Sequence, residues 1–433
     1  MLYCRERLEK EDNNSFVVNI IRRTVMSKIK LTFIGCGGMA GAHLSGYLEL
    51  KRKGMDFFDI VAVADPVEEH TVRFADRISE VQPLPKVERY KDYEKMLQEQ
   101  KPDAADICTP HFLHHTCAIA CFESNVDAIV EKPLGVTMRA AKKMVDSAKE
   151  HGKILAVAEQ VRRWMGPRVV GWAIHSGLIG MPRMFFAQGM YGPGEINPDD
   201  PVYDYRATWR QDKLTSGGGP IFDWGVHYAD LLTYYFGDVD TIHAHTGNFG
   251  HIKFKDSDGN PVEQTVEDTS IATIKFKNGI VGTWGYSGVA FGKSLSYTVY
   301  YGSRGSIYSD SNYPTAPQLQ LWDGTVKNTQ EFISEFLSSV DESVINNYFP
   351  PELFPDPANL KGDYGVMLEV YDFLCAVRDR RRPDLDGWDG LKAQAIPIAF
   401  FEAAYCGQPV KMDDILSERV SVYQQEINDK WQI

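Results

Sequence analysis

The chain has 433 residues, enough for two or three domains of ordinary size. With 43% hydrophobic and 24% charged residues it has the composition of a globular protein, which excludes a disordered or collagen-like chain. The net charge of −13 argues against nucleic acid as a partner, because a protein that binds it needs a basic face. No apolar run reaches the roughly 18 residues that cross a bilayer, so we expect no membrane partner.

The N-terminal residues differ from the rest of the chain. Residues 1–25 are charged and carry no periodic pattern, whereas a clean strand pattern begins just after Met26. We expect residues 1–27 to be an N-terminal extension and Met26 to be the natural first residue; a frayed extension and a targeting segment are the alternatives. The seven cysteines are odd in number and include no CxxC pair, and no secretory signal is present, so we expect a cytoplasmic protein with free thiols.

Residues 28–159 alternate between apolar strands and helical stretches. Strands are expected at Ile29–Ile34, Asp59–Ala64, Ala105–Cys108, Asp127–Val130 and Lys153–Ala158. Helices are expected at Met39–Lys51, up to about Ser79, and at Tyr93–Gln100, His111–Ser124 and Thr137–His151. This alternation predicts an α/β domain of the Rossmann type, with a doubly wound parallel sheet covered on both faces.

Residues 160–433 have a different pattern, with longer strands separated by turns. Strands are expected at Arg183–Met190, Thr241–Asn248, Ser270–Phe276, Ile280–Tyr286, Leu295–Tyr301 and Ser306–Ser309. Asn278-Gly279 between two apolar runs is a strong hairpin signal. The pattern predicts a C-terminal α+β domain with a large, mostly antiparallel sheet. We expect residues 310–363 to be loop-rich and two helices, near Val366–Asp379 and Leu391–Cys406, to close the chain.

A glycine-rich turn follows the first predicted strand. Residues 35–40 read GCGGMA, which matches the G-x-G-x-x-A pattern of a dinucleotide-binding turn. The first glycine permits a tight turn, the second lets a pyrophosphate approach the backbone, and the helix that comes next offers its N-terminus to the phosphates. We therefore predict a dinucleotide cofactor.

Asp65 ends the second predicted strand, where a carboxylate accepts hydrogen bonds from the adenosine ribose and repels a 2′-phosphate. The next four residues supply no cation for such a phosphate, which favours NAD over NADP. Asp65 follows Gly35 by 30 residues, more than the usual spacing of about 20. The charged insert Lys51–Asp56 accounts for the excess, and a plain turn aspartate is the alternative.

Four motifs in order, GCGGMA at 35–40, VAVADP at 61–66, TPHFLHH at 109–115 and VEKPLGVT at 130–137, together resemble the Gfo/Idh/MocA oxidoreductases. This is the family of glucose–fructose oxidoreductase and inositol dehydrogenase. The resemblance covers the chain from Met26 and extends to GQPV at 407–410. It implies that Lys132 projects toward the nicotinamide and the reacting oxygen of the substrate, and that a cis bond often precedes Pro133. The positions expected to bind the cofactor are Gly35, Gly37, Gly38, Met39, Ala40, Asp65, Thr109, His114, Glu131 and Lys132.

A second cluster, a run of glycines at 217–219 followed by Asp223, Gly225, His227 and Asp230, matches the D-x-G-x-H-x-x-D pattern of the same family. Asp223 and His227 are four residues apart, so on one helical turn the carboxylate could orient the imidazole. The glycines could let a polar ligand approach the backbone. The resemblance implies that His227 is the general base, with Asp223 its partner or a hydrogen-bonding group for the substrate; a structural histidine is the alternative.

Two further groups of residues remain open to interpretation. His111, His114, His115, Cys117 and Cys121 crowd one stretch, but the family needs no metal for hydride transfer and we predict none. Aromatic and arginine side chains suit a sugar, and as substrate contacts we select Arg163, Trp209 and Arg210. Core or interface roles are equally open for each of them.

The combined prediction is an NAD-dependent oxidoreductase acting on a secondary alcohol of a sugar, glycoside or cyclitol. One alternative is an NAD-retaining glycoside hydrolase or epimerase of the same family, and another is a nucleotide-binding sensor without turnover. We also expect a homo-oligomer, a dimer or tetramer, formed through the C-terminal sheet.

Overall fold

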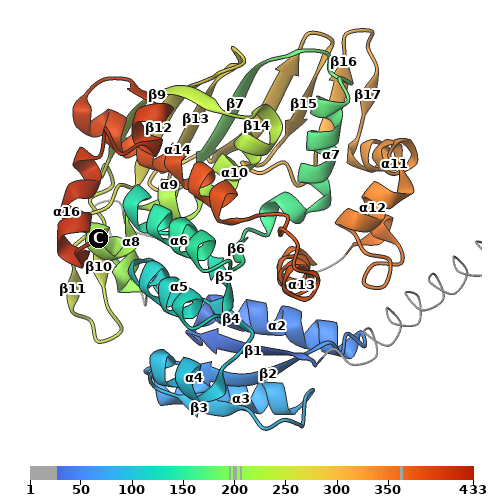
Figure 1. Cartoon of the computed structure of the whole chain (residues 1–433). Coiled ribbons are helices and arrows are strands. Elements are labelled where there is room, and N and C mark those ends of the chain that lie inside the picture. Colours follow the sequence, from blue (N-terminus) through green and yellow to red (C-terminus); the bar gives the residue numbers. More distant parts are fainter. Residues whose placement is uncertain (1–26, 195–196, 198–201, 205–206, 361–363) are drawn as a thin grey trace, which may run out of the picture.

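A computed structural model describes residues 27–194, 197, 202–204, 207–360 and 364–433. The expected N-terminal extension therefore lies outside the described residues, apart from Ser27. Figure 1 shows two halves, a parallel sheet with its helices below and a broad sheet above, with several helices between them. No helix in the described part of the chain is both long and apolar enough to span a membrane.

The N-terminal half is a six-stranded parallel sheet in the order β3-β2-β1-β4-β5-β6, which is the Rossmann order. Its strands are β1 Ile29–Ile34, β2 Phe58–Ala64, β3 Glu88–Tyr90, β4 Ala104–Ile107, β5 Asp127–Glu131 and β6 Leu155–Ala158. Its helices are α2 Gly38–Arg52, α3 Glu68–Ser79, α4 Tyr93–Gln100, η1 His111–Leu113, α5 His114–Glu123 and α6 Met138–Glu150. The five predicted strands are present. The sixth, β3, was not predicted, because it is a three-residue edge strand with no apolar run.

The C-terminal half is built on a nine-stranded sheet in the order β17-β16-β15-β14-β7-β13-β12-β9-β18. These strands are β7 Pro182–Met190, β9 Val239–Gly247, β12 Thr269–Phe276, β13 Val281–Ser287, β14 Leu295–Gly302, β15 Gly305–Ser309, β16 Gln318–Leu321, β17 Val326–Lys327 and β18 Val410–Lys411. The predicted hairpin of β12 with β13 forms, β14 and β15 form a second hairpin, and β7 with β13 is the one parallel pair described in this sheet. A small side sheet holds β8 Val202–Asp204, β10 Lys253–Lys255 and β11 Pro261–Val262.

Helices of this half come from several parts of the chain. They are η2 Val161–Arg163, α7 Met165–His175, η3 Thr208–Gln211, α8 Lys213–Ser216, α9 Pro220–Asp223, α10 Gly225–Phe236, α13 Tyr364–Asp379, α14 Gly387–Cys406, α15 Met412–Leu416 and α16 Val422–Trp431. In Figure 1, α10 and α14 lie between the nine-stranded sheet and the Rossmann half. The predicted fold class is confirmed.

The prediction that residues 310–363 are loop-rich was wrong. The segment contains β16 and β17, α11 Thr329–Ser339, α12 Glu342–Tyr348 and the short η4 Pro357–Asn359. Helix α11 begins at a capping box formed by Asn328 and Glu331, and it buries Phe332 and Phe336. Those two aromatics, four residues apart after an Asn-x-x-Glu start, were the available helix signal.

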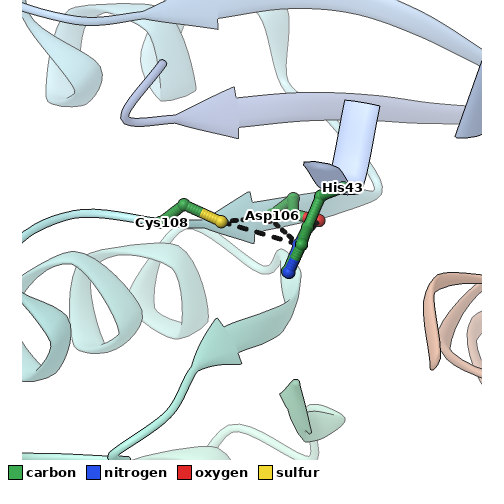
Figure 2. A group of neighbouring side chains, drawn as sticks. All are labelled: His43, Asp106 and Cys108. Atoms are coloured by element: carbon green, nitrogen blue, oxygen red, sulfur yellow. Dashed lines mark hydrogen bonds and ion pairs between the residues drawn. The ribbon is translucent and has the colours of Figure 1, made fainter. Parts of the chain in front are cut away.

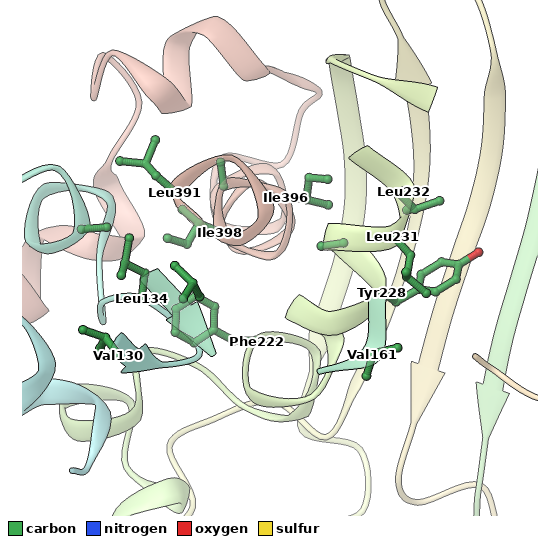
Figure 3. Packing of buried hydrophobic residues seen from close by; sticks show 14 of the residues in the cluster. Val130, Leu134, Val161, Phe222, Tyr228, Leu231, Leu232, Leu391, Ile396 and Ile398 are labelled. Carbon is green, nitrogen blue, oxygen red and sulfur yellow. The ribbon is translucent and has the colours of Figure 1, made fainter. Parts of the chain in front are cut away.

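The apolar core crosses the boundary between the halves. Figure 3 shows Val130 and Leu134 of the Rossmann half packed near Phe222, Leu391 and Ile398 of the C-terminal half. A second cluster combines β1, β2 and α2 with the buried face of α13. Helices α2 and α13 approach so closely at Gly46 that a Cβ there would lie 3.3 Å from the Cα of Met367.

Candidate active site

The parallel strands point their carboxyl ends into one cavity of about 720 Å3, where ligands bind in folds of this type. Its volume lies within the range of about 300–1,000 Å3 that is usual for small-molecule and cofactor sites. The Rossmann half contributes the glycine turn, Asp65, the loop after β4 and Lys132. The C-terminal half contributes Trp209, Arg210, Asp223, Trp224 and His227.

The glycine turn has the geometry of a phosphate-binding loop. Gly35 has a φ of +92°, and a Cβ there would lie 2.5 Å from the carbonyl oxygen of Cys108. A Cβ at Gly37 or Gly38 would meet nothing within 4 Å, so space for a ligand lies against this backbone. Helix α2 begins at Gly38 with no side-chain cap, which leaves amide groups of its first turn for an anion. Met39 also lines the cavity, whereas Ala40 is buried in the core beneath it.

Asp65 ends β2 and shapes the adenosine end of the cavity. Its carboxylate accepts hydrogen bonds from the backbone amides of Cys36 and Val67, both 2.8 Å long, and so fixes the glycine turn. His70 Nδ1 lies 3.2 Å from the same carboxylate. The sequence argument that no cation is near is incomplete, because His70 and Lys91 also line the cavity, Lys91 being paired with Glu68 at 3.3 Å.

Lys132 and Asp223 form a buried ion pair across the two halves. Lys132 Nζ donates to the Asp223 carbonyl oxygen at 2.8 Å and to Asp223 Oδ1 at 3.0 Å. Burial alone would lower the pKa of Lys132, but the charges of Asp223 and Glu131 outweigh it and raise that pKa, so the side chain is an ammonium. Two of its three N–H bonds are used, and the third remains for a ligand. The Lys132–Pro133 bond is cis.

Asp223 lies among several cations. Arg210 Nε donates to Asp223 Oδ2 at 2.9 Å, and His111 Nε2 lies 3.5 Å from Oδ1. Burial would raise the pKa of Asp223, but Lys132, with His111 and Arg210, holds it well below its usual range. Asp223 is therefore a permanent carboxylate that fixes the position of Lys132.

The expected pairing of Asp223 with His227 is wrong. His227 Nδ1 donates instead to both carboxylate oxygens of Glu159, at 2.7 and 2.8 Å, and both side chains are buried. The helical-spacing argument fails because α9 ends at Asp223 and α10 starts at Gly225, with Trp224 between them. Since Nδ1 is engaged and the ring lines the cavity, Nε2 is the nitrogen left for a ligand.

Protein packing requires glycine at 218 and 219. A Cβ at Gly218 would overlap the ring of Phe401, and one at Gly219 would overlap the carbonyl oxygen of Glu267. Of the residues assigned to the substrate, Trp209 and Arg210 line the cavity, and the Arg210 guanidinium lies 4.3 Å from the Trp209 ring centroid.

Arg163 does not belong to this cavity. It is buried and paired with Asp372 at 3.2 Å and Asp384 at 3.4 Å, because it lies in η2 on the side toward α13. It lines a different, polar cavity that also contains Arg168.

The loop after β4 carries the remaining cofactor positions. His114 lies between two carbonyl oxygens, those of Thr109 and Pro133, each 2.9 Å from a ring nitrogen. The hydroxyl of Thr109 is buried and has no hydrogen-bond partner in the described part of the chain. His114 thus braces the cavity wall, of which Thr109 forms part.

Glu131 lines the cavity, but its carboxylate lies within hydrogen-bond distance of His43. His43 belongs to a buried polar cluster with Asp106 and Cys108 (Figure 2). His43 Nε2 lies 3.2 Å from Glu131, and His43 Nδ1 lies 2.9 Å from Asp106, which also accepts from Cys108. Among the described residues, His43, Asp106 and Cys108 are the one group close enough to share a metal. Burial would lower the pKa of His43, but the charge of Asp106 raises it well above its usual value. Hydrogen bonds among these side chains hold the cluster together.

Sequence reasoning missed Glu159, Trp224 and Tyr313. Glu159 directly follows β6, and its place at the carboxyl end of a parallel strand was the available signal. Tyr313 comes from the segment expected to be loop; its hydroxyl donates to the carbonyl oxygen of Trp224 at 2.8 Å, and its ring lies 6.3 Å from that of His227.

Comparison with known proteins agrees with this arrangement. Residues 29–159 match the family model "Oxidoreductase family, NAD-binding Rossmann fold", and residues 168–308 match the "GFO/IDH/MocA C-terminal domain". The levoglucosan dehydrogenase of Pseudarthrobacter phenanthrenivorans is 25% identical over 405 residues, covering 88% of this chain and 97% of that protein. The D-glucoside 3-dehydrogenase of Escherichia coli K12 is 28% identical over 266 residues, covering 58% of this chain and 68% of that protein.

A solved structure has the same fold. It is a levoglucosan dehydrogenase in complex with NADH and levoglucosan, with a TM-score of 0.73 and 23% identity, covering 89% of this chain and 100% of that chain.

Proposed function

The chain belongs to the Gfo/Idh/MocA oxidoreductase family, and within that family we propose that it is an NAD-dependent dehydrogenase acting on a secondary alcohol of a sugar, glycoside or cyclitol. The observation that supports this most is the meeting of Lys132 and His227 in one cavity with a dinucleotide-binding turn. Relatives named as dehydrogenases of levoglucosan, a D-glucoside and myo-inositol support the substrate class.

The residues divide the chemistry of alcohol oxidation between them. His227 Nε2 accepts the proton of the substrate hydroxyl, and the Glu159 carboxylate stabilises the imidazolium that results. The Lys132 ammonium donates to the same oxygen and stabilises the negative charge that develops on it. A bound nicotinamide supplies the hydride acceptor, so alcohol and NAD+ give ketone, NADH and one proton. In reduction the same groups act as acids.

We propose NAD rather than NADP as the cofactor. Gly37 and Gly38 would face the pyrophosphate, and Asp65 the adenosine ribose. The Asp65 carboxylate disfavours a 2′-phosphate, and Lys91, which also lines the cavity, pairs with Glu68 at 3.3 Å.

The test is absorbance at 340 nm with NAD and a panel of sugars, glycosides and cyclitols. Sustained NADH formation from one of them is expected. Product without net NADH would favour the hydrolase or epimerase alternative; nucleotide binding with neither result would favour a sensor and contradict the proposal.

We further propose that copies associate through the outer face of the nine-stranded sheet. Ile271, Met184, Val281 and Tyr301 are exposed there, and the register places them on one face of adjacent strands. A row of exposed apolar side chains is typical of an association surface. Light scattering should show a dimer or tetramer that Ile271→Lys with Val281→Lys converts to a monomer.

A further inference from the structure

A second cavity of about 340 Å3 adjoins the catalytic one. The two share three wall residues, Arg210, Asp223 and Trp224. Its volume is at the lower end of the range for small-molecule sites, which suits one further ring and not an extended chain. A substituent of the substrate that extends from the catalytic cavity past Trp224 therefore enters this second cavity.

Trp224 stands at the junction of the two cavities. Its side chain is 60% exposed, unusually high for a tryptophan beside a catalytic lysine, and Lys132 Nζ lies 5.6 Å from its ring centroid. Its backbone is held by the hydroxyl of Tyr313. An exposed indole is a stacking surface for the apolar face of a sugar ring.

The remaining walls indicate an uncharged, hydroxylated occupant. Ile252, Val266 and Val289 provide apolar surface, and the carboxamides of Gln211 and Gln264 provide polar groups. The charged residues are compensated within the protein. Arg210 pairs with Asp223 at 2.9 Å, and the carboxylate of Asp268 accepts from the amides of Phe249 and Gly250. Among these lining residues, the two carboxylates outnumber the single cation, Arg210, which disfavours a phosphate or carboxylate as the occupant.

We infer that this cavity is a subsite for a second sugar ring, so that the substrate is a disaccharide or longer glycoside oxidised on the unit held between Lys132 and His227. The inference rests on the proposed function and specifies its substrate class. The second ring would stack on Trp224 and face Gln211 and Gln264.

The test compares two substrates that share the oxidised sugar, its methyl glycoside and its disaccharide, in the native protein and in Ile252→Trp. Ile252 is half-buried and lines the second cavity but not the catalytic one. We expect kcat/KM for the disaccharide to exceed that for the methyl glycoside at least tenfold. Ile252→Trp should abolish this advantage and leave the methyl glycoside rate unchanged.

Two controls make the result decisive. Val344→Trp inserts the same bulk at an exposed position on α12 and should leave both rates unchanged. Val289→Trp narrows the cavity from another wall and should repeat the Ile252→Trp result if that variant folds poorly. Equal kcat/KM values for the two substrates, or a preference for the disaccharide that survives both blocking variants, would contradict the proposed subsite but not the proposed function. A phenyl glycoside that outperforms the disaccharide would overturn the sugar as occupant. Absence of NADH from every carbohydrate would overturn the proposed function as well.

Discussion

Glu159→Gln should slow hydride transfer through its effect on His227 alone. The Glu159 oxygens lie 2.7 and 2.8 Å from His227 Nδ1, and both side chains are buried. Glutamine can still accept the hydrogen bond but carries no charge to stabilise the imidazolium. The lost stabilisation of the transition state has a lower bound of about 1.5 kcal/mol, the difference between a charged and a neutral hydrogen bond. Its upper bound is about 4 kcal/mol, the attraction between unit charges about 4 Å apart at an effective dielectric constant of about 20. Turnover should therefore fall roughly 10- to 1,000-fold.

The assay is a pair of double-variant cycles on kcat, measured at 340 nm with saturating NAD. His227→Ala alone should lower kcat by roughly 10²- to 10⁴-fold and leave NADH affinity, measured by tryptophan fluorescence, nearly unchanged. In that background, Glu159→Gln should cost little more, because its target is gone. Asp223→Asn is the matched control: it acts through Lys132, so its effect should persist there.

The opposite pattern would refute this reasoning. If the Glu159→Gln loss added fully to that of His227→Ala while the Asp223→Asn loss vanished, Asp223 and not Glu159 would be the functional partner of the imidazole. A melting temperature equal to that of the native protein is required of each variant, so that a folding defect is not mistaken for a catalytic one.

Three other outcomes are expected. Gly37→Val should weaken NADH binding at least tenfold in a fluorescence titration without lowering the melting temperature, because a Cβ at this position meets nothing within 4 Å in the protein. Gly35→Ala should instead lower the free energy of unfolding in urea by about 1–3 kcal/mol, because it places a side chain on a residue with a φ of +92°. Asp65→Ser combined with Val67→Arg should shift the ratio of kcat/KM values from NAD toward NADP; an unchanged ratio would remove Asp65 from ribose recognition. Burial raises the pKa of Glu267 to about 8, so the folded protein keeps a proton that the unfolded chain loses near pH 4. The contribution of Glu267 to the free energy of unfolding should therefore fall, by up to about 5 kcal/mol, as the pH rises from about 5 to 8. Glu267→Gln should flatten that dependence in urea unfolding at the two pH values, and parallel curves for the two proteins would contradict the assignment.

The sequence was informative where function follows from local order. Gly35, Gly37, Gly38, Met39 and Lys132 were predicted because a turn or a strand end carries its own motif, and the structure brings them into one cavity. Partnerships were not predictable in the same way. Glu159 and His227 are 68 residues apart, and their contact depends on how α10 packs near the end of β6.

Spacing rules failed where an element ends. Asp223 and His227 have helical spacing, yet the break at Trp224 directs one toward Lys132 and the other toward Glu159. Edge strand β3 was missed because its three residues are mostly exposed and form no apolar run. Helix α11 was missed although its capping box and its two buried aromatics were visible in the sequence.

The packing of α13 against α2 bears on how the chain acquires its structure during synthesis. The Rossmann strands emerge first from the ribosome, but the apolar face that Met367, Val370 and Phe373 complete stays uncovered until residue 379 has been made. Helices α14 and α16 add hydrogen bonds at the start of α6: Gln394 Oε1 accepts from the amide of Gly135, and Gln424 Oε1 accepts from the amide of Met138. The nucleotide-binding half is thus completed by residues of the C-terminal half, and a nascent chain halted at residue 160 would present an open apolar surface in place of a finished domain.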